Sequence, residues 1–159
     1  MRKIFNNYNS NKYGVYSLNF FVQGIPTEIT VDDYFPCQKI SEDKVVPLFC
    51  KPQDNELWAL LAEKAWAKLF GTYEVTEAGF MDEAFEYLLG TPAFRYVTDD
   101  YEEDEFWKLI YEADQENSII AAATKSTASK EVGLVANHAY SLISAHEEQG
   151  HRILKLRNP

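Results

Sequence analysis

The segment DNELWALLAEKAWAKLFG, residues 54–71, constrains the fold most, because it carries the clearest helical periodicity in the chain. Asp54 or Asn55 can cap its start, and Gly71 stands where a helix commonly ends. The positions of the predicted helical stripe follow helical spacing, with one polar member among them: Leu57, Leu60, Leu61, Ala65, Lys68 and Leu69. The sequence therefore predicts an amphipathic helix in the first half of the chain.

Strand patterns precede this helix. Residues 14–36, GVYSLNFFVQGIPTEITVDDYFP, contain two strand-like runs separated by a predicted turn at Gly24–Pro26. The stretch KVVPLFC, residues 44–50, predicts another short strand.

Two further helices and a sheet are predicted after it. MDEAFEYLLG ends a second helix at Gly90, and EEDEFWKLIYEADQE predicts a third with acidic residues at its start. The last third is strand-rich, from NSIIAAATK to a final hairpin with a Glu-Glu-Gln-Gly turn. Because helices come early and the sheet late, the fold class is α+β rather than doubly wound α/β. Gly90-Thr91-Pro92 marks the predicted boundary between two lobes, 1–90 and 91–159.

Charge and apolar content exclude several classes of protein. The formal net charge of −10 would repel a phosphate backbone, so we expect no nucleic-acid partner. The N-terminus lacks the apolar region of a signal peptide, and no apolar run is long enough to span a membrane. Two cysteines, Cys37 and Cys50, cannot build a disulfide scaffold. We therefore expect a cytoplasmic protein with no membrane span.

Several short motifs do not meet the requirements of the sites that they suggest. The acidic run DDYEEDE, residues 99–105, lacks the glycine and final glutamate of an EF-hand loop and is interpreted as a solvated helix start. HEEQGH, residues 146–151, spaces its histidines by five in a predicted turn, which does not fit a helical zinc motif. Ser141 lacks the strand-turn-helix context of a serine nucleophile. Cys37 in a predicted loop and Cys50 at a predicted strand end lack a helix N-terminus that would stabilise a thiolate.

His138 and Asn158 remain as candidates for catalysis. A histidine on a half-apolar strand is more often a hydrogen-bonded core residue, and an asparagine before a proline is more often a turn residue. Residue pattern alone leaves both the structural and the catalytic interpretation open.

NHAYSL, residues 137–142, followed by LRNP, residues 156–159, resembles the histidine and asparagine segments of the calpain family of cysteine proteases. The first strand pair, ending in Asp-Asp-x-x-Pro, the helix NELWALLAEKAWAKLFGTYE, the later FWKLI helix and the NSIIAAA strand also occur in family order. The resemblance covers nearly all of the chain from about Tyr13 to Pro159.

The resemblance implies a papain-like cysteine protease core, with a truncated helical first lobe followed by an antiparallel β second lobe. It implies protein substrates and assigns His138 and Asn158 as the catalytic histidine and asparagine. A cysteine nucleophile needs an adjacent imidazole, and an asparagine can orient that ring without adding negative charge. It also implies calcium as cofactor, with Glu56 matching one carboxylate ligand of a first-lobe site.

The nucleophilic cysteine is expected outside this chain. The family's G-D-C-W segment should precede Tyr13, and the family continues with Trp-Gly after the final Arg-Asn-Pro. We therefore expect a fragment of a calpain-type endopeptidase that is inactive alone, with the remaining calpain domains or a partner chain completing it. The alternatives are a non-catalytic calpain-like binding or regulatory module, and an unrelated acidic scaffold.

Overall fold

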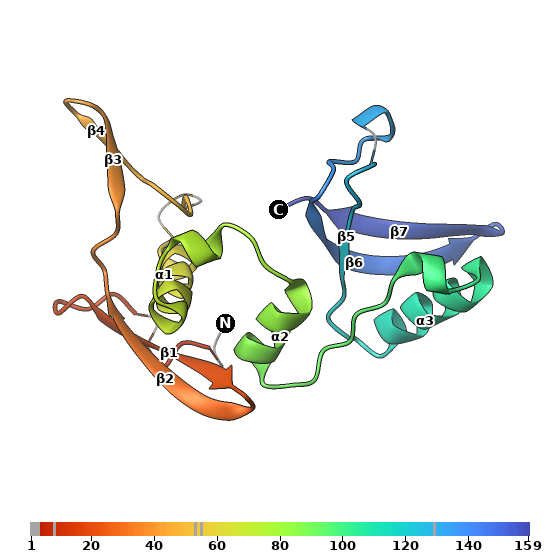
Figure 1. The fold of residues 1–159 in the computed structure, drawn as a ribbon, viewed down its shortest axis with the longest axis horizontal. Helices are drawn as coiled ribbons and strands as arrows, with labels where there is room; N and C mark the ends of the chain where they lie inside the picture. The colour runs from red at the N-terminus through yellow and green to blue at the C-terminus, as the bar shows by residue number, and fades with distance from the viewer. Residues whose placement is uncertain (1–3, 8, 53, 55, 129) are drawn as a thin grey trace. The chain divides into compact units, whose positions relative to one another are not determined.

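The computed structural model of the protein describes residues 4–7, 9–52, 54, 56–128 and 130–159. These residues form helices and antiparallel sheets, which confirms the α+β class (Figure 1). The chain divides into two compact units, Met1–Phe94 (unit 1) and Arg95–Pro159 (unit 2). Unit 1 holds β1 (Val15–Val22), β2 (Ile25–Asp32), β3 (Cys37–Ser41), β4 (Lys44–Pro47), α1 (Trp58–Phe70), η1 (Glu74–Thr76) and α2 (Met81–Leu89). Unit 2 holds η2 (Thr98–Asp100), α3 (Glu103–Gln115), β5 (Ala121–Ala123), η3 (Lys130–Val132), β6 (Ala139–Glu148) and β7 (His151–Arg157).

β1 and β2 form the long hairpin of unit 1 and pair antiparallel along their full lengths. Their turn consists of Gln23 and Gly24, with φ of 53° and 76°, and two positive φ angles are what a type I′ turn requires. The predicted turn at Gly24–Pro26 was therefore placed too late, because Pro26 lies in β2 opposite Phe21. Proline is tolerated there because both strands of a two-stranded sheet are edge strands.

The core of unit 1 lies between this hairpin and α1. Leu18 and Phe20 alternate along β1 and are completely buried. Leu61 and Ala65 lie four residues apart on α1 and belong to the same buried cluster. The Trp66 ring packs against Phe20 with the centroids 6.0 Å apart. The apolar side chains that alternate along β1 thus pack against those that recur every four residues on α1, and together they form one buried core.

α1 begins later than the sequence predicts. It starts at Trp58, and Leu57 is its N-cap residue without a side-chain capping bond. Asp54 lies outside the helix with a φ of 53°, and Asn55 lies outside the described residues. The predicted end of the helix at Gly71 is confirmed.

α2 ends where the sequence predicts, at a glycine that the packing requires. Gly90 follows Leu89 in the left-handed conformation, with a φ of 66°. A Cβ atom at this position would lie 2.4 Å from Cδ1 of Phe21 in β1. Any larger residue would therefore be strained and would also clash with the hairpin.

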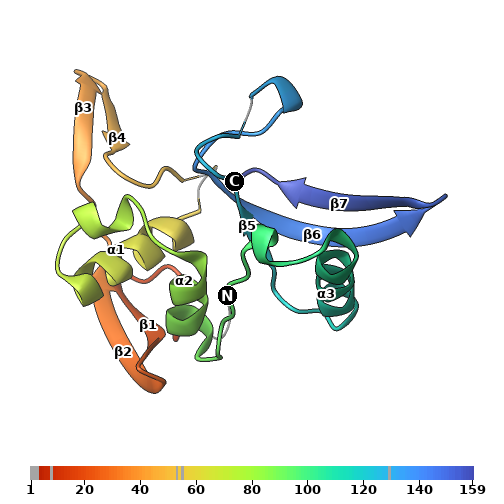
Figure 2. The ribbon, with the colours of Figure 1, turned by 45° about the vertical axis from the view of Figure 1, so that its right-hand side comes forward.

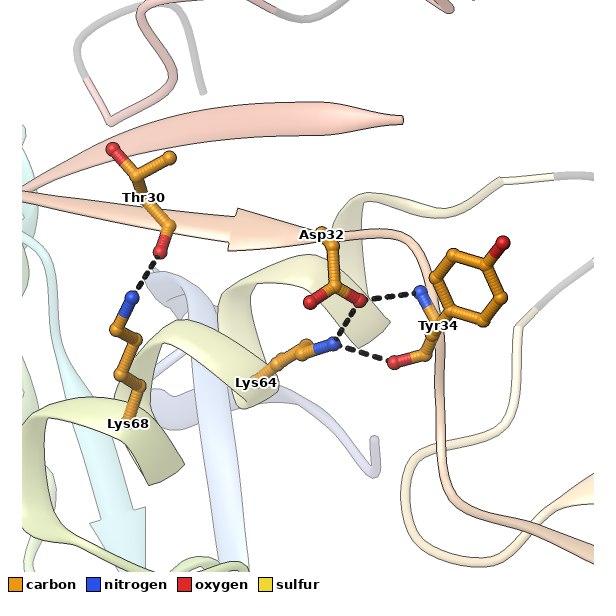
Figure 3. A network of polar contacts seen from close by, with 5 residues as sticks. All are labelled: Thr30, Asp32, Tyr34, Lys64 and Lys68. Atoms are coloured by element: carbon orange, nitrogen blue, oxygen red, sulfur yellow. Dashed lines mark hydrogen bonds and ion pairs between the residues drawn. The ribbon is translucent and has the colours of Figure 1, made fainter. Parts of the chain in front are cut away.

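Two lysines of α1 bind the backbone and side chains at the end of β2 (Figure 3). Lys64 Nζ donates to Asp32 Oδ1 and to the Tyr34 carbonyl oxygen, at 2.5 Å each. Lys68 Nζ donates to the Thr30 carbonyl oxygen at 2.6 Å. These bonds tie α1 to the end of β2, and the Lys68 bond occupies a carbonyl of this edge strand that would otherwise be open to a further strand. They also explain why the one polar member of the predicted helical stripe, Lys68, faces the hairpin.

The ion pair makes the stability of unit 1 depend on pH. The hydrogen bond from Lys64, followed by that from the Tyr34 amide, lowers the pKa of Asp32 below its ordinary value. A carboxylate with a lowered pKa stabilises the fold above its unfolded-state pKa, and this contribution is lost as pH falls through the folded-state pKa. We expect Asp32→Asn to be less stable near neutral pH by under about 1 kcal/mol, because the carboxylate is half exposed. As pH falls below about 5 and on through the lowered folded-state pKa of Asp32, that difference should shrink.

Urea unfolding followed by tryptophan fluorescence at several pH values measures this difference. Asp43→Asn, in the exposed β3–β4 turn, is the matched control, since Asp43 has no ion pair among the described residues. If the difference in unfolding free energy between the wild type and Asp32→Asn stayed constant down to about pH 3, the ion pair of Asp32 would not be the source of the pH dependence.

Unit 2 is a three-stranded antiparallel sheet of order β5-β6-β7, with α3 packed against β6 (Figure 2). Asp114 of α3 accepts a hydrogen bond at Oδ2 from the backbone N–H of Ala145, at 3.1 Å, next to a register shift in β6. The β6–β7 turn consists of Gln149 and Gly150, with φ of 52° and 78°. Both long hairpins therefore close through a Gln-Gly pair with similar positive φ angles. The predicted final turn is confirmed at Gln149 and Gly150, but its two glutamates, Glu147 and Glu148, lie in β6.

None of the helices in the described parts of the chain has both the length and the apolar character needed to cross a membrane.

Candidate active site

His138 and Asn158 are brought together by the β6–β7 hairpin. His138 is the residue before β6, and Asn158 is the residue after β7. Because the strands are antiparallel, the start of β6 and the end of β7 lie at the same end of the sheet (Figure 1). The ring Nε2 of His138 lies 2.7 Å from Oδ1 of Asn158. Two residues twenty positions apart thus form a direct side-chain hydrogen bond.

This contact selects one tautomer of the neutral imidazole. An amide oxygen can only accept a hydrogen bond, so Nε2 of His138 must carry the proton that Asn158 Oδ1 accepts. The other ring nitrogen, Nδ1, then has a free lone pair in the neutral ring. His138 is therefore arranged to take a proton at Nδ1 while Nε2 stays bound to Asn158.

The ring of His138 also has an aromatic neighbour. Tyr140 is buried, and its ring meets the His138 ring edge-to-face, with centroids 5.1 Å apart and an interplanar angle of 89°. The Tyr140 hydroxyl oxygen accepts a hydrogen bond from the backbone N–H of Val135, at 3.0 Å. The Tyr140 hydroxyl is thus held by a hydrogen bond, and the His138 ring packs against the buried Tyr140 ring.

Neither cysteine has the environment of a nucleophile. Cys37 is exposed and begins β3, so its predicted position in a loop was wrong. Cys50 is half-buried and lies in a bend after β4, so the prediction that it ends a strand was also wrong. Burial, and then the nearby Glu63 carboxylate, raise the pKa of the Cys50 thiol. A raised pKa keeps the thiol protonated and therefore disfavours nucleophilic attack.

Glu56 does not form a calcium site with the other described residues. Its Oε2 accepts a hydrogen bond from the indole Nε1–H of Trp58, at 2.9 Å. Within the described parts of the chain, no three histidine, cysteine, aspartate or glutamate side chains cluster closely enough to hold a metal ion. Calcium prefers six to eight oxygen ligands, which one exposed carboxylate cannot supply. The residues present therefore do not fit a calcium site on their own.

The acidic run has structural partners, in line with its interpretation as a helix start. Asp99 forms an ion pair with Lys125, which lowers the pKa of this carboxyl. Asp104 Oδ1, in the first turn of α3, lies 2.7 Å from an Arg152 guanidinium nitrogen. The guanidinium also lies over the Trp107 ring, 5.7 Å from its centroid. These contacts join the start of α3 to β7.

The segment HEEQGH forms the end of β6, the turn and the start of β7, as predicted. His146 Nε2 lies 2.8 Å from the Ser144 hydroxyl. His151 is opposite Glu148 in the strand register. The two histidines thus take part in an ordinary hairpin.

A histidine whose ring is oriented by an asparagine amide is the pair found in papain-like cysteine peptidases. The sequence profile of the calpain family cysteine proteases matches residues 1–159. The chain therefore belongs to the calpain family.

Curated relatives agree with this assignment. The chain is 31% identical over 159 residues to the calpain-type cysteine protease DEK1 of Arabidopsis thaliana, and the match covers 94% of the chain and 7% of that protein. It is 33% identical over 154 residues to human Calpain-12, covering 92% of the chain and 21% of that protein. It is 28% identical over 162 residues to mouse Calpain-9, covering 96% of the chain and 23% of that protein. The chain thus spans less than a quarter of the length of these relatives.

Proposed function

We propose that this chain supplies the catalytic histidine and asparagine of a calpain-type cysteine endopeptidase that acts on protein substrates. The observation that carries the proposal is the 2.7 Å contact between His138 Nε2 and Asn158 Oδ1. Because neither Cys37 nor Cys50 suits the nucleophile, the reacting thiol comes from a segment outside these 159 residues. The chain is therefore inactive alone.

The geometry of the pair fits the proton transfers of this reaction. His138 Nδ1 takes the proton of the cysteine thiol, and the resulting thiolate attacks the carbonyl carbon of the scissile peptide. The imidazolium then returns its proton to the leaving amine nitrogen as the C–N bond breaks, leaving a thioester. Water attacks the thioester carbonyl and gives a proton to Nδ1, which releases the carboxylic acid product and restores the thiol.

Asn158 orients the ring in every step of this sequence. Its Oδ1 accepts the Nε2–H bond whether His138 is neutral or protonated, since Nε2 carries hydrogen in both states. An aspartate there would add a negative charge that competes with the thiolate for the imidazolium. The neutral amide instead fixes orientation and leaves the cation to pair with the sulfur.

In this proposal the two lobes are residues 1–90 and 91–159. The division of the chain into compact units at Phe94 and Arg95 supports a boundary near Gly90. The helical C-terminal half of unit 1 and the three-stranded sheet of unit 2 are the parts that fit a papain-like arrangement.

The proposal includes dependence on calcium, and Glu56 is the one residue of this chain that it assigns as a calcium ligand. Its carboxylate is exposed and could be one ligand of a site completed by residues outside the chain. By itself this carboxylate should bind calcium with a Kd above about 1 mM, which is the Kd of the weakest complete calcium sites in proteins.

Reconstitution tests the proposed function. The chain is mixed with a second polypeptide that carries the cysteine-bearing segment of a calpain core, and hydrolysis of a labelled protein is measured with calcium or with a chelator. We expect activity only in the mixture and only with calcium. A double variant, Cys37→Ser with Cys50→Ser, should keep full activity, because neither thiol reacts. Absence of activity in a mixture whose two polypeptides co-purify would instead favour a non-catalytic calpain-like module.

A further inference from the structure

We propose that Thr124 is the positioning residue of this site, because its hydroxyl closes the turn that presents His138. The inference rests on the proposed function for its catalytic meaning, but its structural part can be tested without any peptidase assay. Thr124 follows β5 directly and is half-buried. Its hydroxyl bonds to backbone groups of Val135 and His138, so we infer that it acts on the reaction through His138.

The Thr124 side chain and backbone both bind the His138 segment. The backbone N–H of His138 donates to Thr124 Oγ1 at 3.0 Å, and the backbone N–H of Thr124 donates to the His138 carbonyl oxygen at 2.9 Å. Thr124 Oγ1 also lies 2.5 Å from the carbonyl oxygen of Val135 and 3.1 Å from that of His138. A single residue directly after β5 therefore binds both ends of the turn from Val135 to His138.

The hydroxyl has one hydrogen, and the distances indicate where it goes. The Val135 carbonyl is the nearer acceptor, and the His138 carbonyl already receives the Thr124 N–H. The hydroxyl thus donates to Val135 and accepts from His138. In a closed β-turn the carbonyl of the first residue accepts the N–H of the fourth directly. Here the Thr124 oxygen bonds to both of these groups and so links the two ends of the turn through one hydroxyl.

The backbone of this turn supports the same interpretation. Asn137, the residue before His138, has a φ of 50°, in the left-handed region that asparagine tolerates better than most residues. Its N–H lies 3.4 Å from the Lys125 carbonyl oxygen, a weak contact compared with those of Thr124. Without the hydroxyl, the His138 N–H and the Val135 carbonyl would either bond directly or lose their partner. Either outcome moves the His138 backbone, and so shifts the ring from Asn158.

Thr124→Val removes the hydroxyl but keeps a β-branched side chain of the same shape. Thr124→Ser keeps the hydroxyl and is the rescue variant, and Thr127→Val is the control at an exposed threonine of the same loop. The first readout is the pair of ¹⁵N resonances of the His138 ring in the 159-residue chain at about pH 8, where an ordinary histidine is neutral. In the wild type we expect Nδ1 to resonate as a bare nitrogen and Nε2 as a protonated one. In Thr124→Val the two resonances should move toward each other, and in both other variants they should not.

The second readout is the rate of the reconstituted peptidase. We expect Thr124→Val to lower kcat roughly tenfold, the effect of losing one hydrogen bond that orients a reacting group, with KM unchanged. Thr124→Ser should restore the rate to within about twofold of wild type. If Thr124→Val keeps the wild-type ¹⁵N separation, or if Thr124→Ser is as impaired as Thr124→Val, the inference is wrong. A shifted ¹⁵N pattern in a chain whose reconstituted mixture has no activity would uphold the positioning role and refute the proposed function.

Discussion

Replacing His138 by alanine is expected to lower the rate of the reconstituted peptidase by about 10⁴-fold or more, the loss seen when one member of a catalytic triad is removed. The physical reason is that the proton transfers from the thiol, to the leaving amine and from the attacking water all lose their carrier. Without Nδ1 the thiol stays largely protonated at neutral pH, and the leaving amine has no positioned acid. The measurement is kcat/KM for a labelled protein substrate, with purified polypeptides at matched concentration.

The chain offers a matched control in β6, the strand that begins directly after His138. His146→Ala removes an exposed histidine of β6 whose Nε2 lies 2.8 Å from the hydroxyl oxygen of Ser144 in the same strand. It should leave kcat/KM within about twofold, because a surface substitution of this kind changes little. Alkylation by iodoacetamide gives a second readout, since His138→Ala should shift the pH profile of the reactive thiol toward that of free cysteine. Activity within about tenfold of wild type in His138→Ala would show that another group carries the protons.

The pairing of His138 with Asn158 was predictable in part, because the two residues lie at the ends of a predicted hairpin, whereas their assignment as catalytic residues came from the resemblance to calpains. The motifs around His138 and Asn158 lie twenty residues apart, and a Gln-Gly turn with two positive φ angles folds them back onto each other. Alternating apolar residues and this turn chemistry are visible in the sequence. The resulting 2.7 Å bond is a consequence of register, which the turn sets as far as Ser144 and a bulge between Ser144 and Leu142 then shifts by one residue before the site.

Thr124 could not be found in the same way. Its hydroxyl meets groups eleven and fourteen residues away, across a loop that carries η3. Neither hydrophobic period nor local motif marks such a contact, because it depends on how the loop returns to the sheet. A threonine after a three-residue strand is indistinguishable in sequence from a solvent-facing one. The tertiary structure is needed to identify it.

The error at the start of α1 has a local cause. The sequence offers polar residues at 54 and 55 as caps, but the helix begins only at Trp58. Asp54 takes a positive φ instead, and Glu56 uses its carboxylate to bind the Trp58 indole rather than a backbone N–H. Because the Glu56 carboxylate binds another side chain, it does not accept the backbone N–H groups that are free at the start of the helix. The other end was predicted correctly because Gly71 needs no such partner.

Phe20→Ala is expected to lower the free energy of unfolding of unit 1 by about 3–5 kcal/mol, the range for truncating a fully buried phenylalanine. Phe20 is completely buried among Leu18, Leu61 and Ala65, and its ring contacts Trp66. Removing the ring loses its transfer from water and leaves a cavity that strand β1 and helix α1 cannot close without moving. Since small domains are stable by about 5–15 kcal/mol, the variant should be close to unfolding.

Urea unfolding, followed by circular dichroism and by tryptophan fluorescence, to which Trp66 contributes, measures this loss. Phe94→Ala makes the same chemical change at a side chain that is 75% exposed, and it should cost less than about 0.5 kcal/mol. Phe20→Leu should fall between the two, at about 1–1.5 kcal/mol, because it keeps most of the buried apolar volume. If the three variants unfolded at the same urea concentration with unchanged slope, the hairpin and α1 would not share a core. The ordering Phe94→Ala, Phe20→Leu, Phe20→Ala follows from burial alone and requires no assumption about catalysis.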